Sequence, residues 1–301
     1  MLVWNEPQLK DRDWISRCVK ESGYMGSDAS FANIYLLKSK YKTKVSFYKD
    51  FLIRYYEGHG NRQGYTFPLG YGKTEKALEA IKQDAADNNR KLEFCFITEE
   101  QKAALNAFYG DIFEYSRDDG DSDYIYGQQE LASLSGRIYH KKKNHVSKFK
   151  RTYEDMQYRQ IGDANIEDAV VIEDRWYKEH LQDNDSSAQF EYQAIKEALL
   201  HFNELALTGG IIYVNNIPVA MTIASYINDN VVDIHFEKCI GEYAVNGGYA
   251  AINQIHVQTL TNVDYINREE DINIPGLRKA KESYHPKIML KKYGAVEKQG
   301  N

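Results

Sequence analysis

The segment VVDIHFEKC, residues 231–239, carries ionisable side chains at alternate positions of a predicted strand. This alternation predicts that Asp233, His235 and Glu237 share one face of the strand, opposite the apolar residues between them. A carboxylate or an imidazole in a partly buried place is suited to act as a general base that deprotonates an amine. The alternative is an ordinary solvated strand face, because half-exposed antiparallel sheets show the same pattern.

A pair of glycines stands directly before a predicted helix at residues 249–260. A helix that begins at a glycine turn offers unpaired backbone N–H groups and the positive end of its dipole, which together favour phosphate. The candidate phosphate-binding residues are Asn246, Gly247, Gly248 and Tyr249. An ordinary turn is the alternative, since a glycine pair alone is a weak motif.

Residues 134–153 contain no acidic side chain, although the chain has a net charge of −6. The cations of this stretch are Arg137, Lys141, Lys142, Lys143, Lys148, Lys150 and Arg151. The spacing of the apolar positions predicts one amphipathic helix with the cations outward; these positions are Leu131, Leu134, Ile138, His145, Phe149, Tyr153 and Met156. Such a run is often only a solvated face. A polyanion partner (RNA, an anionic lipid surface or a CoA-like ligand) would relieve the repulsion between the cations.

Two further candidates lie nearer the C-terminus. A predicted strand at 263–267 runs into a charged loop whose candidate cleft residues are Asn267, Arg268, Glu269 and Asp271. Loops at strand ends often carry function, but a charged loop can also be merely solvated. Tyr284 ends a predicted helix at 277–284 and could donate a proton to a leaving group, or it could simply pack in the core.

The predicted elements that position these residues follow one order in the second half of the chain. Two helices (166–181 and 191–207) precede three strands (210–214, 218–227 and 231–239), which are separated by Asn and Asp turns. The glycine turn, a helix, a strand, a helix and a last strand then follow. The first half repeats the order less clearly, with a helix after the glycines of LGYG and a Thr98–Gln101 capping box. We therefore expect a mixed α/β (α+β) chain of two duplicated domains, residues 1–130 and 131–301, with the basic helix 137–151 opening the second.

The cysteine spacing and the absence of common motifs argue against several classes of protein. The three cysteines are far apart, which favours a reducing compartment. The sequence has no CxxC, HExxH, GxSxG or GxxxxGK[ST] motif, so no metal site is expected and no cofactor is expected to be tightly bound. No signal peptide is recognisable, and the longest uncharged run is interrupted by Asn215, Asn216 and Pro218. We expect a cytoplasmic protein without a membrane span.

The order of meander, glycine turn, helix, strand, helix and strand resembles the Gcn5-related N-acetyltransferase (GNAT) fold. Two such units in tandem resemble the Fem-type peptidyltransferases and the C-terminal domain of phosphatidylglycerol lysyltransferase. The segments that carry the resemblance are LSGRIYHKKKNHVSKF, HFEKCIGEYAVNGGYAAINQ and YINREEDINIPGLRKAKESYHPKIMLKKYGA. They are similar to a bacterial family grouped with that lysyltransferase domain.

The resemblance implies transfer of an acyl or aminoacyl group to an amine or hydroxyl acceptor. The donor would be aminoacyl-tRNA or acyl-CoA, with its phosphates at residues 246–249 and with Glu237 or His235 as the base. Residues 246–249 lack the full Q/R-x-x-G-x-G/A signature of CoA-using members, which favours aminoacyl-tRNA held by the basic helix. An acyl-CoA-dependent N-acetyltransferase and a non-catalytic polyanion-binding protein remain the alternatives.

Overall fold

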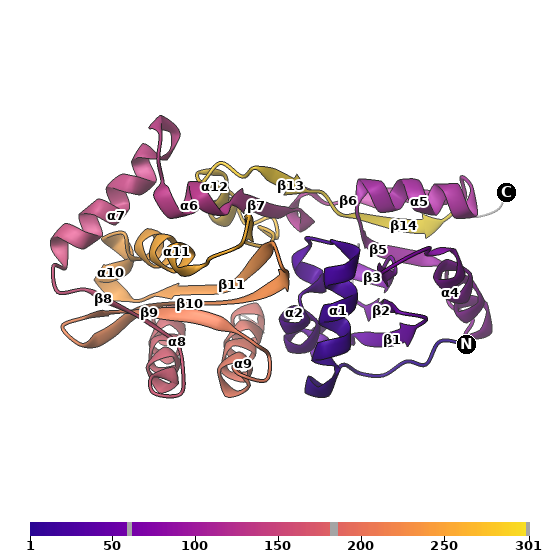
Figure 1. Cartoon of the computed structure of the whole chain (residues 1–301), viewed down its shortest axis with the longest axis horizontal. Coiled ribbons are helices and arrows are strands. Elements are labelled where there is room, and N and C mark those ends of the chain that lie inside the picture. Colours follow the sequence, from indigo (N-terminus) through magenta and orange to yellow (C-terminus); the bar gives the residue numbers. More distant parts are fainter. Residues whose placement is uncertain (59–61, 181–185, 299–301) are drawn as a thin grey trace. The chain divides into compact units, whose positions relative to one another are not determined.

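The computed structural model describes residues 1–58, 62–180 and 186–298 (Figure 1). The chain divides into two compact units, each built around one sheet. Unit 1 comprises Met1–Tyr124, Glu269–Arg278 and Met289–Asn301, and unit 2 comprises Ile125–Arg268 and Lys279–Ile288. The chain first passes from unit 1 into unit 2 between Tyr124 and Ile125, close to the expected boundary at residue 130. The partition differs from the expectation because two C-terminal segments return to unit 1.

Unit 1 has a seven-stranded sheet in the order β1-β2-β3-β5-β14-β6, with β4 paired to β2. Its strands are β1 (Lys44–Tyr48), β2 (Phe51–Glu57), β3 (Gln63–Tyr65), β4 (Leu69–Gly70), β5 (Glu93–Ile97), β6 (Phe113–Arg117) and β14 (Tyr293–Glu297). Its helices are α1 (Arg12–Ser22), α2 (Phe31–Leu36), α3 (Lys38–Tyr41), α4 (Glu75–Asp87) and α5 (Glu99–Tyr109). The last strand of the chain, β14, lies between β5 and β6, so the C-terminus completes the sheet of the first half.

Local sequence explains the helices of this sheet. In α4, Leu78, Ile81 and Ala85 recur at spacings of three and four and pack into the core around Phe94. The predicted capping box at the start of α5 is confirmed, since the Thr98 and Gln101 side chains each accept from the other's backbone N–H. The sequence analysis did not predict α1, α2 or α3.

Unit 2 is built on a seven-stranded sheet in the order β13-β7-β12-β11-β10-β9-β8. The strands are β7 (Asp123–Gly127), β8 (Gln157–Gln160), β9 (Thr208–Val214), β10 (Ile217–Asn228), β11 (Val231–Cys239), β12 (Tyr265–Asn267) and β13 (Ile288–Leu290). The helices are α6 (Gln128–Ser133), α7 (His140–Thr152), α8 (Ile166–His180), α9 (Ser186–Leu200), α10 (Gly241–Val245), α11 (Gly248–Thr259) and α12 (Pro275–Glu282). The predicted two helices, three-stranded meander, helix, strand and helix are confirmed. No helix among the described residues is both long and apolar enough to cross a membrane.

Strand β12 is short and pairs with only the first part of β11, and this short pairing positions the site. The two strands pair in parallel only from Val231–Tyr265 to Asp233–Asn267. Beyond Asp233, within the described part of the chain, β11 pairs only with β10. Helix α11 packs against β9, β10 and β11 (Figure 1). The far half of β11 therefore has an open edge, where its side chains can meet α11 and a ligand.

The expected single helix across residues 131–156 is wrong. The chain leaves α6 at Leu134, which has φ 45°, and Gly136 has φ 99°, so a short 3-10 turn precedes α7. Both residues take left-handed backbone angles that a continuous helix excludes. Ile138 and His145, assigned to the apolar face, are exposed. The inward stripe of α7 is instead Lys142, Val146, Phe149 and Tyr153, at spacings of four, three and four.

Candidate functional site

The predicted common face of Asp233, His235 and Glu237 is wrong, because β11 contains a β-bulge. Glu237 pairs with Thr222 of β10 and Asp233 pairs with Ser225, so His235 is an extra residue between them. Thr222 and Ser225 are three residues apart on a regular part of β10, so they face opposite sides of the sheet. Glu237 therefore lies on the α11 side, and Asp233 and His235 lie on the other side.

Glu237 is held by residues from two neighbouring elements. Asn253 of α11 donates through Nδ2 to Glu237 Oε1 at 2.9 Å, and Arg268, directly after β12, forms an ion pair with Oε2. The two charged side chains are 11% and 14% exposed. Burial alone would lower the pKa of Arg268, but the Glu237 carboxylate raises it above its ordinary value. Arg268 is therefore a permanent buried cation beside the open edge of β11.

Some polar atoms around this ion pair have no hydrogen-bond partner. Arg268 Nη1 is a buried donor, and Asn253 Oδ1 is a buried acceptor, that find no partner among the residues the structure describes. Thr222 pairs with Glu237 across the two strands, and its Oγ1 is also buried without a hydrogen-bond partner among the described residues. An unsatisfied buried polar atom costs about 1–3 kcal/mol and calls for an explanation. A bound carbonyl or oxyanion would satisfy Arg268 Nη1.

Tyr284 and Lys142 complete what we call the Glu237 cluster: Glu237, Asn253, Arg268, Tyr284 and Lys142. The Arg268 guanidinium lies 4.7 Å from the centre of the Tyr284 ring, and Lys142 Nζ lies 4.0 Å from it. Burial raises the pKa of Tyr284 to about 12, so its hydroxyl keeps its proton. Burial, and then the positive charge of Arg268, lower the pKa of Lys142 to about 8, while Glu237 raises it in part. The cluster thus combines a fixed cation, a hydroxyl donor and an amine that exchanges a proton near neutral pH.

The other face of β11 has a separate polar pair. His235 Nε2 lies 2.8 Å from Ser225 Oγ, and His235 Nδ1 lies 3.4 Å from Asp233 Oδ2. Both His235 and Asp233 are buried. They do not join the Glu237 cluster, so the base candidates predicted from one strand belong to two different places.

The glycine turn packs tightly against α7. A Cβ atom on Gly247 would lie 2.4 Å from the backbone oxygen of His145, and one on Gly248 would lie 2.4 Å from Cys239 Sγ. Gly247 also has φ 101°. Asn246 donates to the Tyr153 hydroxyl at 2.8 Å. Close packing with α7 and β11 therefore accounts for both glycines.

The fourth residue of the turn faces α8. Trp176 Nε1 donates to the Tyr249 hydroxyl at 2.8 Å, and burial raises the pKa of Tyr249 to about 12. Its aromatic side chain thus links the start of α11 to α8. A phosphate-binding role for residues 246–249 stays a prediction.

We expect Gly247→Ala to lower the free energy of unfolding by about 2–4 kcal/mol, because an alanine there must either leave a left-handed backbone angle or displace α7. Chemical denaturation measures the loss. Gly276→Ala is the matched control, since a Cβ at Gly276 would meet nothing within 4 Å. An unchanged midpoint for Gly247→Ala would show that the turn and α7 are not in contact.

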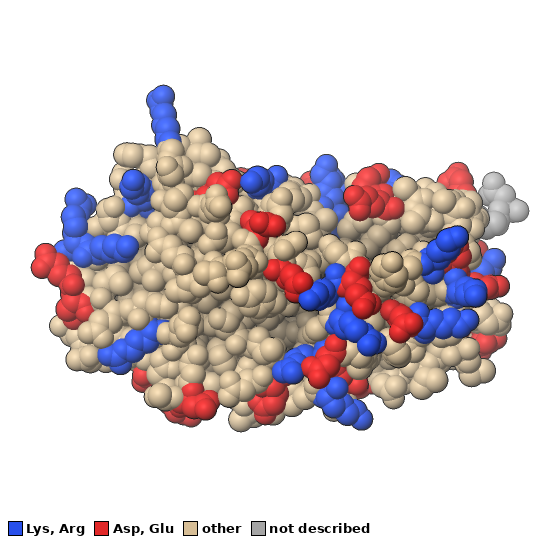
Figure 2. All heavy atoms as spheres, viewed as in Figure 1, with Lys and Arg blue, Asp and Glu red and all other residues tan. Residues whose placement is uncertain are grey.

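Six cations of the basic stretch stay exposed to solvent. These residues, which we call the basic face, are Arg137, Lys141, Lys143, Lys148, Lys150 and Arg151. No carboxylate within residues 1–58, 62–180 and 186–298 forms an ion pair with any of them. Figure 2 shows Lys and Arg side chains spread over the region where Figure 1 places α7. Lys142 is the exception, because it lies on the inward stripe of α7 and belongs to the Glu237 cluster.

The predicted cleft loop does not form one group. Asn267 is buried at the end of β12, and Arg268 joins the Glu237 cluster. Glu269 accepts from Asn33 Nδ2 at 2.8 Å in unit 1. The Asp271 carboxylate binds the Tyr124 hydroxyl at 2.6 Å and pairs with Arg278 at 2.7 Å, which are contacts that stabilise the loop of unit 1.

Sequence reasoning missed two members of the Glu237 cluster. Lys142 was assigned to the outward cations, although its spacing to Val146, Phe149 and Tyr153 would have placed it on the inward stripe. Asn253 gave no signal, because one amide inside an apolar helix pattern does not reveal a partner on a strand.

Comparison with known proteins agrees with this architecture. Residues 20–296 match the family described as phosphatidylglycerol lysyltransferase, C-terminal. A conserved protein of unknown function from Bacteroides thetaiotaomicron is 33% identical, with a TM-score of 0.92 over 99% of this chain and 100% of that one. L-PGS from Bacillus licheniformis is similar at 13% identity, with a TM-score of 0.68 over 99% of this chain and 94% of that chain. FemX is similar at 7% identity, with a TM-score of 0.62 over 98% and 97%.

A curated relative, an uncharacterized protein of Mycoplasmoides gallisepticum, is 23% identical over 184 residues. The match covers 58% of this chain and 56% of that relative, so the chain spans about half the length of the curated protein it matches. The expected mixed α/β fold is confirmed, with two units that each contain one sheet and helices. The chain belongs to the family of the phosphatidylglycerol lysyltransferase C-terminal domain.

Proposed function

We propose that this chain transfers an aminoacyl group from aminoacyl-tRNA to an amine or hydroxyl acceptor, with the Glu237 cluster as its reaction centre. The observation that carries the proposal is Arg268 Nη1, a buried donor without a partner among the described residues, beside a lysine whose pKa is about 8. Transfer of an acyl group needs a donor for the oxyanion and a group that moves a proton. Unit 2 brings both together at the open edge of β11.

The structure suggests a role for each member of the cluster. The acceptor attacks the ester carbonyl of the donor, and Lys142 in its amine form takes the acceptor's proton. Arg268 Nη1 and the Tyr284 hydroxyl donate to the oxyanion that develops on the carbonyl oxygen. Glu237 and Asn253 hold Arg268 in place. The new amide or ester bond forms as the ester to tRNA breaks, and the proton passes from Lys142 to the tRNA hydroxyl that leaves.

Helix α7 supports tRNA as the donor, because it serves both the reaction centre and the surface. Its inward residue Lys142 reaches the cluster, while the basic face lies outward along the same helix. A tRNA bound along the basic face would place its aminoacylated end close to Lys142. The contact of Gly247 with the His145 backbone covers the glycine turn, which disfavours the turn as a seat for CoA phosphates. Because aminoacyl-tRNA is a cytoplasmic substrate, the proposal also places the protein in the cytoplasm.

The basic face can be tested separately from the reaction centre. We expect micromolar binding of bulk tRNA that falls steeply with salt, because each released counterion contributes to the slope. The variant Lys141→Ala/Lys143→Ala/Lys148→Ala removes exposed charges only, and we expect it to weaken tRNA binding at least about tenfold and to flatten the salt dependence. Fluorescence anisotropy at two salt concentrations measures both effects.

The control for this experiment is Lys10→Ala/Lys20→Ala/Lys73→Ala, an equal change of charge at exposed lysines of unit 1. It should bind tRNA like the wild type. CoA in place of tRNA is the competing ligand. Saturable CoA binding that both triple variants keep, together with no tRNA binding, would contradict the proposal and favour an acyl-CoA-dependent acetyltransferase.

A further inference from the structure

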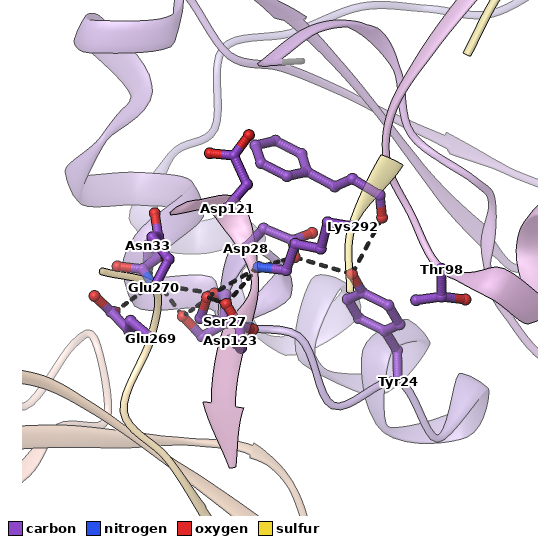
Figure 3. Close-up of polar contacts among 12 residues, drawn as sticks. Tyr24, Ser27, Asp28, Asn33, Thr98, Asp121, Asp123, Glu269, Glu270 and Lys292 are labelled. Atoms are coloured by element: carbon purple, nitrogen blue, oxygen red, sulfur yellow. Dashed lines mark hydrogen bonds and ion pairs between the residues drawn. The ribbon is translucent and has the colours of Figure 1, made fainter. Parts of the chain in front are cut away.

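Helix α8 carries a buried carboxyl group that the proposed chemistry does not use. In unit 1, the buried carboxylates of Asp28 and Asp123 both meet the ammonium group of Lys292, as Figure 3 shows. Glu173 of α8 is 1% exposed, but neither of its carboxyl oxygens has a hydrogen-bond partner among the residues that the structure describes. A carboxylate buried in this way is costly, so the structure corresponds to the neutral, protonated form of Glu173.

This carboxyl group changes its charge near neutral pH. Burial raises the pKa of Glu173 to about 7; Lys238 lowers this pKa in part, and Glu191 and Asp174 raise it further. Once Glu173 has lost its proton, its carboxylate is a buried charge, and a buried charge is stable only beside a partner of opposite sign. The ionised form of Glu173 therefore needs a cation that it does not hold in this structure.

The cation in reach of Glu173 is Lys238 of β11. Lys238 Nζ lies 3.4 Å from the centre of the Trp176 ring. Trp176 stands three residues after Glu173, which puts the two side chains next to each other on the surface of α8. The other lysine that affects the Glu173 pKa, Lys196 of α9, already lies 3.0 Å from the Asp174 carboxylate. A short movement of the Lys238 side chain is therefore enough to bring its ammonium group to Glu173.

The rest of this face of the sheet offers Glu173 no further cation with a permanent charge. Helix α8 packs against α9, β10 and β11, and β10 contains no Asp, Glu, His, Lys or Arg. On β11, Asp233 and His235 lie on the same side as Lys238, and His235 Nδ1 lies 3.4 Å from Asp233 Oδ2. Lys238 is thus the residue on which the charge of Glu173 acts most directly.

In the structure, Lys238 joins β11 to α9. Its Nζ lies 2.5 Å from Glu191 Oε1. The Lys238 side chain is 4% exposed, whereas the Glu191 side chain is 44% exposed. Water can solvate the Glu191 carboxylate if Lys238 leaves it, but an ionised Glu173 depends on a protein partner. An ionised Glu173 therefore gains more from Lys238 than Glu191 loses.

We propose that Lys238 passes from Glu191 to Glu173 when Glu173 loses its proton, and that this exchange loosens α9 from β11. The proton of Glu173 goes to solvent, and Glu191 becomes a solvated carboxylate. In the acidic form the ion pair holds α9 on the sheet, and in the basic form Lys238 is held by α8 instead. Unit 2 thus has a proton-controlled contact on the face of the sheet opposite the Glu237 cluster.

The test is hydrogen exchange of the α9 backbone amides (residues 186–200) in the full chain, at about pH 6 and about pH 8, on either side of the Glu173 transition. The rates are corrected for the intrinsic pH dependence of amide exchange. We expect the corrected exchange of α9 to be roughly tenfold faster at the higher pH, as loss of one charge-assisted interaction predicts. Equal corrected rates at the two pH values would overturn the proposal.

Two variants fix the two forms. Glu173→Gln keeps the shape of the side chain and stays neutral, so we expect slow α9 exchange at both pH values. Glu191→Gln removes the partner of Lys238 in the acidic form, so we expect exchange at both pH values as fast as that of the wild type at about pH 8. Glu167→Gln, at an exposed carboxylate of α8, is the matched control and should behave like the wild type.

A pH dependence that survives in Glu173→Gln would overturn the role of Glu173. If Glu173→Gln does not fold, Glu191→Gln still decides the matter, because slow exchange in that variant at about pH 6 would show that Lys238 does not hold α9 through Glu191. None of these measurements depends on tRNA binding or on aminoacyl transfer.

Discussion

Lys142→Met lowers the rate of aminoacyl transfer by about 10²–10⁴-fold, the range expected for loss of a positioned general base. Methionine keeps the length of the side chain and its packing over Tyr284, but it cannot take a proton. In the wild type the transfer rate should rise with pH and then level off, because the amine form of Lys142 is the active one. The midpoint of the rise should lie near the Lys142 pKa of about 8. Initial rates measured across that range check both expectations.

The same substitution should stabilise the protein. The folded-state pKa of Lys142 lies below its ordinary value of 10.5, so at neutral pH the folded state holds a charge that burial disfavours. This cost persists below about pH 8 and disappears as pH rises toward 10.5, where the unfolded state also loses the proton. Lys142→Met should therefore raise the free energy of unfolding at pH 7 by about 1 kcal/mol, after allowance for partial exposure.

Lys143→Met is the matched control, since Lys143 is the exposed neighbour on the same helix. It should leave the free energy of unfolding and the pH profile unchanged. If Lys142→Met lost stability together with activity, Lys142 would be a structural residue. If Lys142→Met retained the wild-type pH profile, the base would have to be another group.

Lys292→Met lowers the free energy of unfolding by about 3–5 kcal/mol at neutral pH, the second large effect that we predict. Lys292 is 3% exposed and is the ion-pair partner of both Asp28 and Asp123, which are 6% and 0% exposed. Its removal leaves Asp123 without its cation and Asp28 with Arg54 alone. Burial opposes the charge on Lys292, but the carboxylates of Asp123 and Asp28 raise its pKa well above its ordinary value. The Lys292 charge that supplies this stabilisation is thus fully present below pH 10.5.

The destabilisation should shrink at acidic pH, because protonation of Asp123 removes the charge that Lys292 neutralises. Urea denaturation at two pH values measures this. Lys291 is exposed and directly precedes Lys292 in the chain. Lys291→Met should change the free energy of unfolding by less than about 0.5 kcal/mol. Equal effects of Lys291→Met and Lys292→Met would show that Lys292 does not form its ion pairs with Asp28 and Asp123.

Much of the fold of unit 2 was predictable, because its helices and strands have strong periodicity and clear turn residues. The meander at 208–239 and helix α11 follow the predicted ranges within a few residues. The return of β14 to the first sheet was not predictable, since a short strand gives no sign of which partner it pairs with. The break in the basic stretch was visible only in part, through Gly136.

Most residues of the Glu237 cluster were predicted from the sequence, but their arrangement in space was not. Glu237, Arg268 and Tyr284 were all candidates, and the structure brings them together. One β-bulge separates Glu237 from His235 and Asp233, and no residue type in β11 marks that bulge in advance. The buried ion pairs of unit 1 escaped the sequence analysis because they join segments as distant as Asp28 and Lys292.

The most direct test of aminoacyl transfer is a turnover assay with a pool of tRNA charged with radiolabelled amino acids. The purified chain is incubated with this pool and with lipid and small-molecule extracts as acceptors, and label that leaves tRNA for an acceptor is counted. We expect transfer that the wild type and Lys73→Met, at an exposed lysine outside the basic face, perform and that Lys142→Met and Arg268→Gln lose. Label that stays on tRNA with every acceptor extract, while the same preparation releases CoA from acetyl-CoA, would contradict aminoacyl transfer.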